Sequence, residues 1–277
     1  MTLLGPAEIR DLAEQLDLQP TKKLGQNFVV DGNTVRRIVR VAGVEAGDEV
    51  LEVGPGLGSL TLGLLDAGAR LTAVEIDSRL AAQLPLTVAE LAPDAVDRLT
   101  VISADAMKVT DLPGAPKRLV ANLPYNVSVP VLLHLLQTVP TLESGLVMVQ
   151  AEVGQRIAAA PGSKVYGSPS VKAAWYGRWA TAGQVSRQVF WPVPNVDSIL
   201  VSFTRGSLPG SEDERAEVFA LVDGAFGQRR KMLRQALAEQ LGGSAAASLL
   251  LESAGVDPTL RGEQLSMPDF LAIARAR

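Results

Sequence analysis

The chain has 277 residues, of which 47% are hydrophobic and 20% charged, and its formal net charge is −4. This composition excludes general disorder, and no apolar run reaches the ~18 residues that a membrane-spanning helix needs. Cysteine is absent and His134 is the only histidine. Disulfides, thiolate metal sites and cysteine nucleophiles are therefore excluded, and one imidazole is too few for a zinc cluster. We expect a cytoplasmic, monomeric globular protein without a metal centre.

The charge is unevenly distributed along the chain. Residues 41–105 contain eleven acidic and three basic side chains, whereas residues 153–196 contain five basic side chains and no acidic one. Such a division would let one face bind a polyanion while another stays acidic, although ordinary solvated charge explains it as well. The net charge by itself therefore does not exclude nucleic acid as a partner.

Alternating strand and helix patterns occupy the first two thirds of the chain. Helical patterns at 58–67, 79–91 and 129–138 separate short β-rich runs. We interpret His134 as a partly buried residue of the third of these helices. The strands are expected at 48–54, 69–77, 97–105, 117–124 and 144–150. This β-α-β-α order predicts an α/β fold with a mostly parallel, Rossmann-like sheet and helices on both faces.

The last third of the chain changes in character. Residues 171–186 and 196–204 are expected to close the sheet with antiparallel strands, and 207–214 has the composition of a linker. From 215 onward the pattern is typical of helices alone. The sequence therefore predicts two domains, an α/β domain at 1–205 and a small all-helical domain at 206–277.

A glycine-rich turn follows the first predicted strand of the sheet. Gly54-Pro55-Gly56-Leu57-Gly58 lets the backbone approach a ligand where a Cβ would obstruct it. Ser59 stands at the third glycine position of a dinucleotide motif, and Pro55 removes a backbone donor, which favours a nucleoside without a pyrophosphate. Glu75, at the end of the next strand, can accept the hydroxyl protons of a ribose, and Asp105 can accept from an adenine amino group. A structural turn with helix-capping acids is the less favoured interpretation.

The fourth predicted strand ends in Asn122-Leu123-Pro124-Tyr125. The Asn122 side-chain oxygen and the Leu123 carbonyl, restrained by Pro124, can accept hydrogen bonds from an exocyclic amine, and Tyr125 can stack on a base. This motif resembles that of adenine-N6 methyltransferases that use S-adenosylmethionine. Within that class the chain resembles the small-subunit ribosomal RNA dimethyladenosine transferases, the KsgA/RsmA family.

Further motifs extend the resemblance over nearly the whole chain. Residues 22–28 resemble the segment that closes over the cofactor, and 189–198 resemble a proline-rich loop. The resemblance implies that Phe190 covers the second face of the adenine, beside the catalytic Asn122, Leu123, Pro124 and Tyr125. It implies S-adenosylmethionine contacts from Gln26, Asn27, Val29, Gly54, Gly56, Glu75, Ile76, Asp105, Ala106 and Asn122.

Two stretches depart from the family pattern, and a third matches it. Ser168-Pro169 replaces a usual Arg-Leu pair, and Asn195 replaces a common lysine, so no cationic role is transferred to these positions. Residues 226–234 match a basic helix, which implies RNA-binding roles for its cations, although charge alone is equally consistent with a solvated helical face. These cations are Arg229, Arg230, Lys231 and Arg234.

The resemblance implies a reaction, a cofactor and a partner. The expected activity is S-adenosylmethionine-dependent N6,N6-dimethylation of two adjacent adenosines near the 3′ end of 16S rRNA during assembly of the small ribosomal subunit. One alternative is the related dimethylation of large-subunit rRNA. Another is a ribosome-assembly factor that retains the fold without the activity. A nicotinamide oxidoreductase is less favoured because of Ser59 and Pro55.

Overall fold

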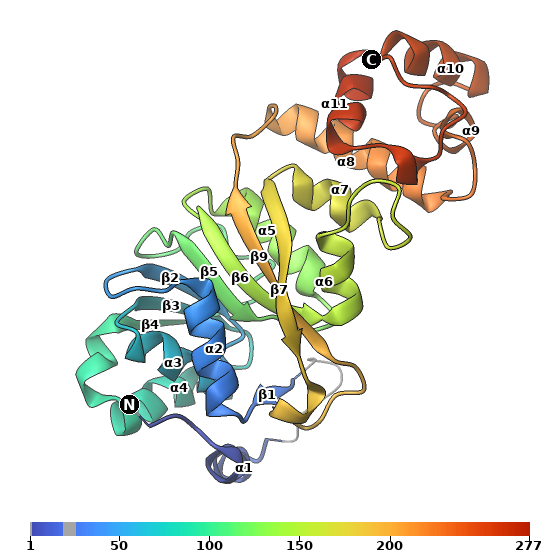
Figure 1. Ribbon diagram of the computed structural model, residues 1–277. Helices are drawn as coiled ribbons and strands as arrows, with labels where there is room; N and C mark the ends of the chain where they lie inside the picture. The colour runs from blue at the N-terminus through green and yellow to red at the C-terminus, as the bar shows by residue number, and fades with distance from the viewer. Residues whose placement is uncertain (1, 19–25) are drawn as a thin grey trace. The chain divides into compact units, whose positions relative to one another are not determined.

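The computed structural model describes residues 2–18 and 26–277 (Figure 1). Residues 22–25, part of the predicted cofactor-covering segment, lie outside the described residues. Two compact units are formed, one by Met1–Gly154 with Ala180–Arg205 and the other by Gln155–Trp179 with Gly206–Arg277. This division differs from the predicted domains, because residues 155–179 belong with the C-terminal helices.

The first unit is organised around a seven-stranded sheet with the order β4-β3-β2-β5-β6-β9-β7. The pairs formed among β2, β3, β4, β5 and β6 are parallel, and β9 is antiparallel to β6. The predicted mostly parallel sheet is thus confirmed, as are all five expected strands. The strands are β2 (Glu49–Val53), β3 (Arg70–Glu75), β4 (Leu99–Ser103), β5 (Arg118–Asn122), β6 (Ser144–Gln150), β7 (Gly177–Val185) and β9 (Ser198–Arg205).

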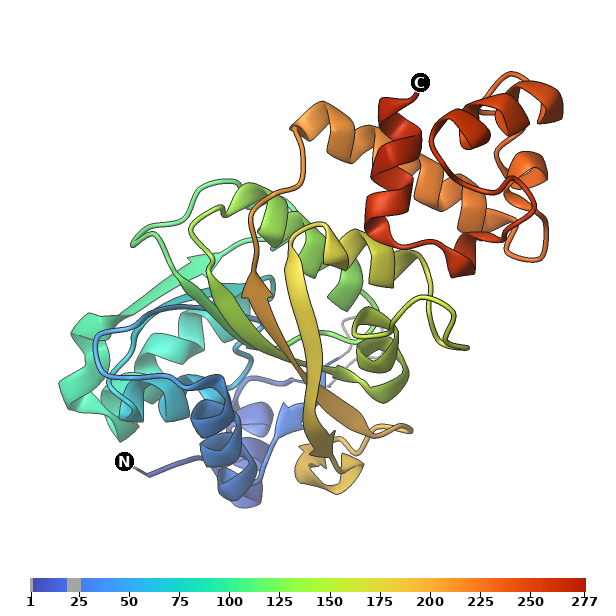
Figure 2. The same cartoon turned by 45° about the horizontal axis from the view of Figure 1, so that its top comes forward.

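Helices cover both faces of this sheet (Figures 1 and 2). Since β-α-β crossovers are right-handed, the helices that follow β2 and β3 lie on one face, and the helix that follows β5 lies on the other. His134, in α5, is half-buried, and its Nε2 lies 2.8 Å from the Val109 carbonyl oxygen. The helices are α1 (Pro6–Gln15), α2 (Gly32–Ala42), α3 (Ser59–Asp66), α4 (Ser78–Leu91), α5 (Ser128–Thr138) and α6 (Ala151–Ile157).

A second, two-stranded sheet pairs β1 (Phe28–Val29) with β8 (Phe190–Trp191). Immediately after β1, Asp31 caps α2 by accepting a hydrogen bond from the Thr34 backbone at 2.8 Å, and α2 ends at Gly43 in the left-handed conformation. The short ladder therefore ties the N-terminal segment to the proline-rich loop that precedes β9.

The second unit is helical. Phe219 of α8 meets the rings of Trp175 and Tyr176 edge-on, and α8 packs against α11 and α7. The segment 171–186, expected as a strand, is partly helical, because α7 includes its first four residues. No helix among the described residues is long and apolar enough to span a membrane. The helices are α7 (Ser168–Ala174), α8 (Glu212–Gly227), α9 (Leu233–Ala236), α10 (Ser244–Ser253) and α11 (Met267–Arg275).

Candidate active site

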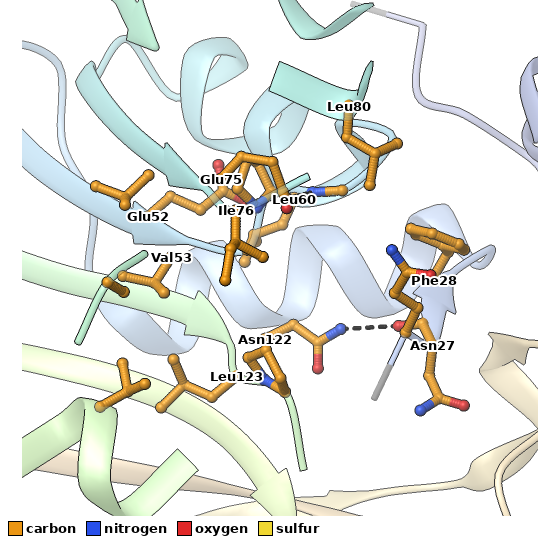
Figure 3. Close-up of a pocket in the computed structure, with 18 of the residues that line it drawn as sticks. Asn27, Phe28, Glu52, Val53, Leu60, Glu75, Ile76, Leu80, Asn122 and Leu123 are labelled. Atoms are coloured by element: carbon orange, nitrogen blue, oxygen red, sulfur yellow. Dashed lines mark hydrogen bonds between the residues drawn. The ribbon is translucent and has the colours of Figure 1, made fainter. Parts of the chain in front are cut away.

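A cleft opens at the carboxyl ends of the parallel strands, where the strand order reverses between β2 and β5 (Figure 3). Ligands of open α/β sheets bind at such a switch point. The lining encloses about 970 Å³, including the open mouth. All predicted cofactor-binding residues line this cleft, namely Gln26, Asn27, Val29, Gly54, Gly56, Glu75, Ile76, Asp105, Ala106 and Asn122.

The glycine turn forms one wall of the cleft in a conformation that requires glycine. Gly54, Gly56 and Gly58 have φ values of +68°, +58° and +101°, in the left-handed region. A Cβ on Gly56 would lie 2.7 Å from a ring carbon of Phe28, which also lines the cleft. The backbone at Gly56 is therefore packed too tightly for any side chain.

Glu75 holds this turn from the end of β3. Its two carboxylate oxygens accept hydrogen bonds from the backbone N–H groups of Gly56 at 3.1 Å and Asp77 at 3.0 Å. Burial raises the pKa of Glu75, and the hydrogen bonds from Asp77 and Gly56 oppose that shift. Each carboxylate oxygen has two lone pairs, so the same group can still accept ribose hydroxyls.

A second buried carboxyl group, Glu52, lines the cleft and was missed by the sequence reasoning. It is 1% exposed, and Thr61 Oγ1 donates a hydrogen bond to it at 2.7 Å. Burial raises the pKa of Glu52 to about 8, and the neighbouring charge of Glu75 adds to the effect. An acid between two apolar residues of a strand, Leu51 and Val53, was the available sequence signal.

The side chain of Asn122 is oriented by a single hydrogen bond at the end of β5. Its Nδ2 donates to the Asn27 backbone oxygen at 3.0 Å (Figure 3). Its Oδ1 is buried and has no hydrogen-bond partner among the described residues. A buried acceptor without a partner is costly, so this oxygen is suited to a ligand that donates a hydrogen bond.

The remaining motif residues complete this side of the cleft. Leu123 and Pro124 line it beside Asn122, and the Leu123 N–H is bonded to the Met148 carbonyl at 3.1 Å. Tyr125 also lines the cleft, and its hydroxyl lies 2.6 Å from Ser198 Oγ on β9. Burial raises the pKa of Tyr125, with the Ser198 hydrogen bond acting in the opposite direction. The Tyr125 phenol therefore stays neutral while its ring is held in place.

Phe190 is not among the residues that line this cleft, and its contact with an adenine stays a prediction. Its side chain is 1% exposed within the hydrophobic core, and it is absent from the lining of the cleft. Its burial accompanies the β1–β8 ladder, in which Phe190 pairs with Val29. Phe28, on the same ladder and not singled out from the sequence, contributes the aromatic ring that lines the cleft.

The predicted basic helix is corrected. Helix α8 ends at Gly227, and residues 228–232 form a turn before α9, so three of the four cations lie outside any helix. Arg229 is engaged within the unit: its Nε bonds Glu263 at 2.7 Å and its Nη2 bonds the Lys164 carbonyl at 3.1 Å. Arg230 and Lys231 are exposed, and Arg234 lies in α9.

The positions that depart from the family pattern have local structural roles. Ser168 and Pro169 begin α7, and Ser168 Oγ donates to Asp223 at 3.2 Å. Asn195 is exposed, and its carbonyl accepts a hydrogen bond from Arg187 at 2.6 Å. Within the described part of the chain, no three metal-ligating side chains gather at one point, and the absence of a metal stays a prediction.

The cleft fits S-adenosylmethionine. The glycine turn lines the cleft, and Glu75 presents a carboxylate at the end of β3. Asn122 presents a buried acceptor that has no partner among the described residues. This combination on a Rossmann-like sheet defines a methyltransferase that uses this cofactor.

Comparison with known proteins identifies the family. The family model for ribosomal RNA adenine dimethylase matches residues 18–276, so the chain belongs to this family of enzymes. Ribosomal RNA small subunit methyltransferase A of Leifsonia xyli subsp. xyli (strain CTCB07) is 72% identical over 99% of this chain and 98% of its own length. The protein of the same name from Streptomyces coelicolor is 61% identical, covering 98% and 96%.

Solved structures share the fold. A dimethyladenosine transferase from Plasmodium falciparum superposes with a TM-score of 0.75 and 24% identity, covering 88% of this chain and 94% of that one. The 23S rRNA methyltransferase ErmE gives a TM-score of 0.65 at 24% identity, covering 90% and 99%. Only the second of these two names states a ribosomal RNA, so the shared fold does not by itself select the substrate.

Proposed function

We propose that this protein transfers methyl groups from S-adenosylmethionine to the N6 atoms of two adjacent adenosines near the 3′ end of 16S rRNA, two on each, during assembly of the small ribosomal subunit. The observation that carries the proposal is the buried Oδ1 of Asn122, which has no hydrogen-bond partner in the part of the chain that the structure describes. Asn122 lines the cleft in the same motif as Tyr125. The names of the relatives at 72% and 61% identity support the small subunit as the source of the substrate.

The chemistry required of the protein is modest but specific. The lone pair of an adenine N6 is delocalised into the ring, so acceptors that bind its protons favour the pyramidal, nucleophilic nitrogen. Asn122 Oδ1 and the Leu123 carbonyl are the two acceptors that we assign to this role. The cofactor supplies an already activated methyl group, so no strong base is needed, and alignment of the reacting atoms provides much of the rate.

The target base has to leave its stack to enter the cleft. Tyr125 is the aromatic residue that we assign to stack on the extruded adenine, because its ring is fixed by Ser198 and lies next to Asn122 in the motif. Phe28 lines the same cleft on β1 and is a candidate for a further aromatic contact, and Phe190 remains the residue that we propose for the second face of the adenine.

The proposed substrate also implies the partner and the place of action. The partner is the assembling small ribosomal subunit, which places the protein in the cytoplasm, and we propose that it acts as a monomer. Arg230, Lys231 and Arg234 are the proposed phosphate contacts of the second unit, because they have no ion-pair partner among the described residues.

The experiment that tests the proposal is incubation with labelled methyl donor and unmodified small-subunit particles, followed by digestion of the RNA. We expect dimethyladenosine from two adjacent positions of 16S rRNA. Label in 23S rRNA, supplied as large-subunit particles in a parallel reaction, would instead indicate a large-subunit methyltransferase. Binding to small-subunit particles without methyl transfer would indicate an assembly factor without activity.

A further inference from the structure

A group of cations on the first unit is not explained by the proposed catalytic site. Helix α2 carries Arg36, Arg37 and Arg40 and contains no acidic residue. Arg36 and Arg40 are exposed and one helical turn apart, an arrangement that weakens a helix through like-charge repulsion. None of these three arginines has a guanidinium nitrogen within 4.0 Å of a carboxylate oxygen among the described residues. We call these three residues the arginine face.

The arginine face stands out against the charge of its surroundings. The unit that contains it has 20 acidic and 14 basic residues in its sequence, a net charge of −6. One acid lies beside this helix, the cap residue Asp31, and the hydrogen bond from the Thr34 side chain and the charge of Arg36 both lower its pKa. Three cations against this one acid run against the sign of the unit. A cation cluster with an excess of positive charge on an acidic body is the electrostatic pattern of a site for a polyanion.

Arg37 joins this face to the sheet edge. Its Nη1 donates to the Gln184 carbonyl of β7 at 2.9 Å, which uses one of the five N–H donors of a guanidinium. A side chain at Gly183, whose φ is +126°, would overlap the Arg37 guanidinium. The guanidinium is therefore held against the β7 backbone, and part of the cost of ordering a long side chain is met before any ligand binds.

A polar groove of about 740 Å³ lies beside Arg37. It is lined also by Ser186, Val189 and Asp197, among others. The acid in it is neutralised, because Arg187 binds Asp197 through its Nε and its backbone N–H, both at 3.0 Å. The groove therefore presents the charge of Arg37 without an opposing unpaired carboxylate.

The groove adjoins the catalytic cleft through the β1–β8 ladder. Val29 lines the cleft, and the next residue, Val30, bonds the carbonyl of Val189, which lines the groove, at 2.8 Å. On the other side, Asp197 of the groove precedes Ser198, which holds Tyr125. Residues that line the groove and residues that line the cleft are therefore adjacent in the chain or joined by hydrogen bonds.

We propose that the groove and the arginine face of α2 bind the RNA phosphates that flank the target adenosine, with Arg37 as the contact nearest the cleft and Arg36 and Arg40 extending the track. The inference rests on the proposed function, because it takes the position of the RNA strand from the adenine site. The contacts are to phosphates, so they position the strand without reading its sequence.

The test compares the full chain carrying Arg36→Gln, Arg37→Gln and Arg40→Gln with the unchanged protein. Affinity for unmodified small-subunit particles should fall about tenfold or more, and the slope of log affinity against log salt should decrease by about 2 to 3. Methyl-donor affinity and the rate at saturating particles should stay within about twofold, because phosphate contacts of this kind position the strand and leave the reacting groups unchanged.

Two further variants separate RNA binding from a folding defect. The double variant Arg36→Gln and Arg40→Gln leaves the Arg37 hydrogen bond intact and should retain the thermal stability of the parent while losing part of the salt slope. The control is Arg70→Gln with Lys117→Gln, which removes two exposed cations at the amino ends of the strands, opposite the cleft. This control should leave the salt slope unchanged.

The outcomes are distinct. A salt slope of the triple variant equal to that of the control would overturn the inference, as would an affinity loss confined to particles and absent for protein-free 16S rRNA, which would indicate an acidic ribosomal protein as the partner. The unchanged protein is assayed for dimethyladenosine in parallel. Failure of that reaction would refute the proposed function, whereas its success with an unaffected salt slope would refute this inference alone.

Discussion

The backbone carbonyl of Asn27 accepts a hydrogen bond from Asn122 Nδ2 at 3.0 Å, although the two residues are 95 positions apart in the chain. This contact fixes which way the amide of Asn122 is turned, since the carbonyl holds the amide nitrogen and the oxygen has no partner within residues 2–18 and 26–277. The segment that precedes β1 therefore orients the side-chain amide of Asn122, at the end of β5. The hydrogen bond joins Asn27, a predicted contact of S-adenosylmethionine, to Asn122, the proposed acceptor from the adenine amine.

Asn122→Ala should lower the rate of methyl transfer by about 10²- to 10³-fold, as expected for loss of one positioned hydrogen-bonding group. Asn122→Asp should be similarly impaired, because a carboxylate cannot donate to the Asn27 carbonyl. Single-turnover transfer and equilibrium binding of the methyl donor measure the two effects, and donor binding should persist in both variants. Asn126→Ala, in the exposed turn that follows the motif, is the control. Normal turnover of Asn122→Ala would contradict the assigned role.

Tyr125 offers a test that separates its ring from its hydroxyl group. Tyr125→Ala should cost about 1–3 kcal/mol in kcat/KM for particles through lost stacking, whereas Tyr125→Phe should lose only the Ser198 hydrogen bond, about 0.5–1.5 kcal/mol. Ser198→Ala removes the same bond, so the double variant with Tyr125→Phe should be no worse than either single one. If the two single losses instead add up in the double variant, Tyr125 and Ser198 act independently, and the hydrogen bond between them does not position the ring.

Glu52 makes the stability of the fold depend on pH. Its pKa is about 8 in the folded protein against an ordinary value of 4.5, so between these limits the unfolded chain releases a proton that the folded protein retains. Stability should therefore decline as pH rises from about 4.5 through about 8. In denaturant unfolding at about pH 5 and about pH 9, Glu52→Gln should remove up to a few kcal/mol of this decline.

The control for that comparison is Glu49→Gln, at the half-exposed start of the same strand. It should leave the pH dependence of unfolding as it is in the parent protein. An equal decline with pH in the Glu52→Gln variant and its parent would show that the buried carboxyl is not the titrating group.

We expect Arg229 to stabilise the second unit, whereas its neighbours Arg230 and Lys231 bind RNA. Arg229→Lys should lower the stability of the second unit by about 0.5–1 kcal/mol, since a lysine cannot span Glu263 and the Lys164 carbonyl, and the pair is partly solvent-exposed. Arg230→Gln or Lys231→Gln should leave thermal unfolding unchanged and reduce the salt slope of particle binding by about 0.7–0.9 each. If Arg229→Lys changes only the salt slope and the other two variants lower stability, Arg229 binds RNA and its two neighbours stabilise the unit.

Much of the fold could be predicted because the signals are local. The strands β2 to β6 are short apolar runs bounded by turn residues, and the helices between them follow a 3.6-residue period, so the parallel sheet was evident from the pattern. The end of α8 at Gly227 could not be predicted in this way. The basic residues that follow have good helix propensity, and tertiary contacts of the turn determine that the helix ends before them. The β1–β8 ladder could not be predicted either, because strands of two residues are too short to show an alternating hydrophobic pattern.

The amino-acid sequence by itself determined the chemistry that is present: a glycine turn, a carboxylate at the end of β3 and an Asn-Leu-Pro-Tyr motif at the end of β5. Their order along parallel strands brings them to one edge of the sheet. Only the tertiary structure decided which side chains are available there. It placed Phe190 in the core and Arg229 in an ion pair, and it left Asn122 Oδ1 without a partner among the residues it describes. Burial and hydrogen-bond partners depend on residues distant in the chain, such as Asn27 for Asn122, and no local pattern records them.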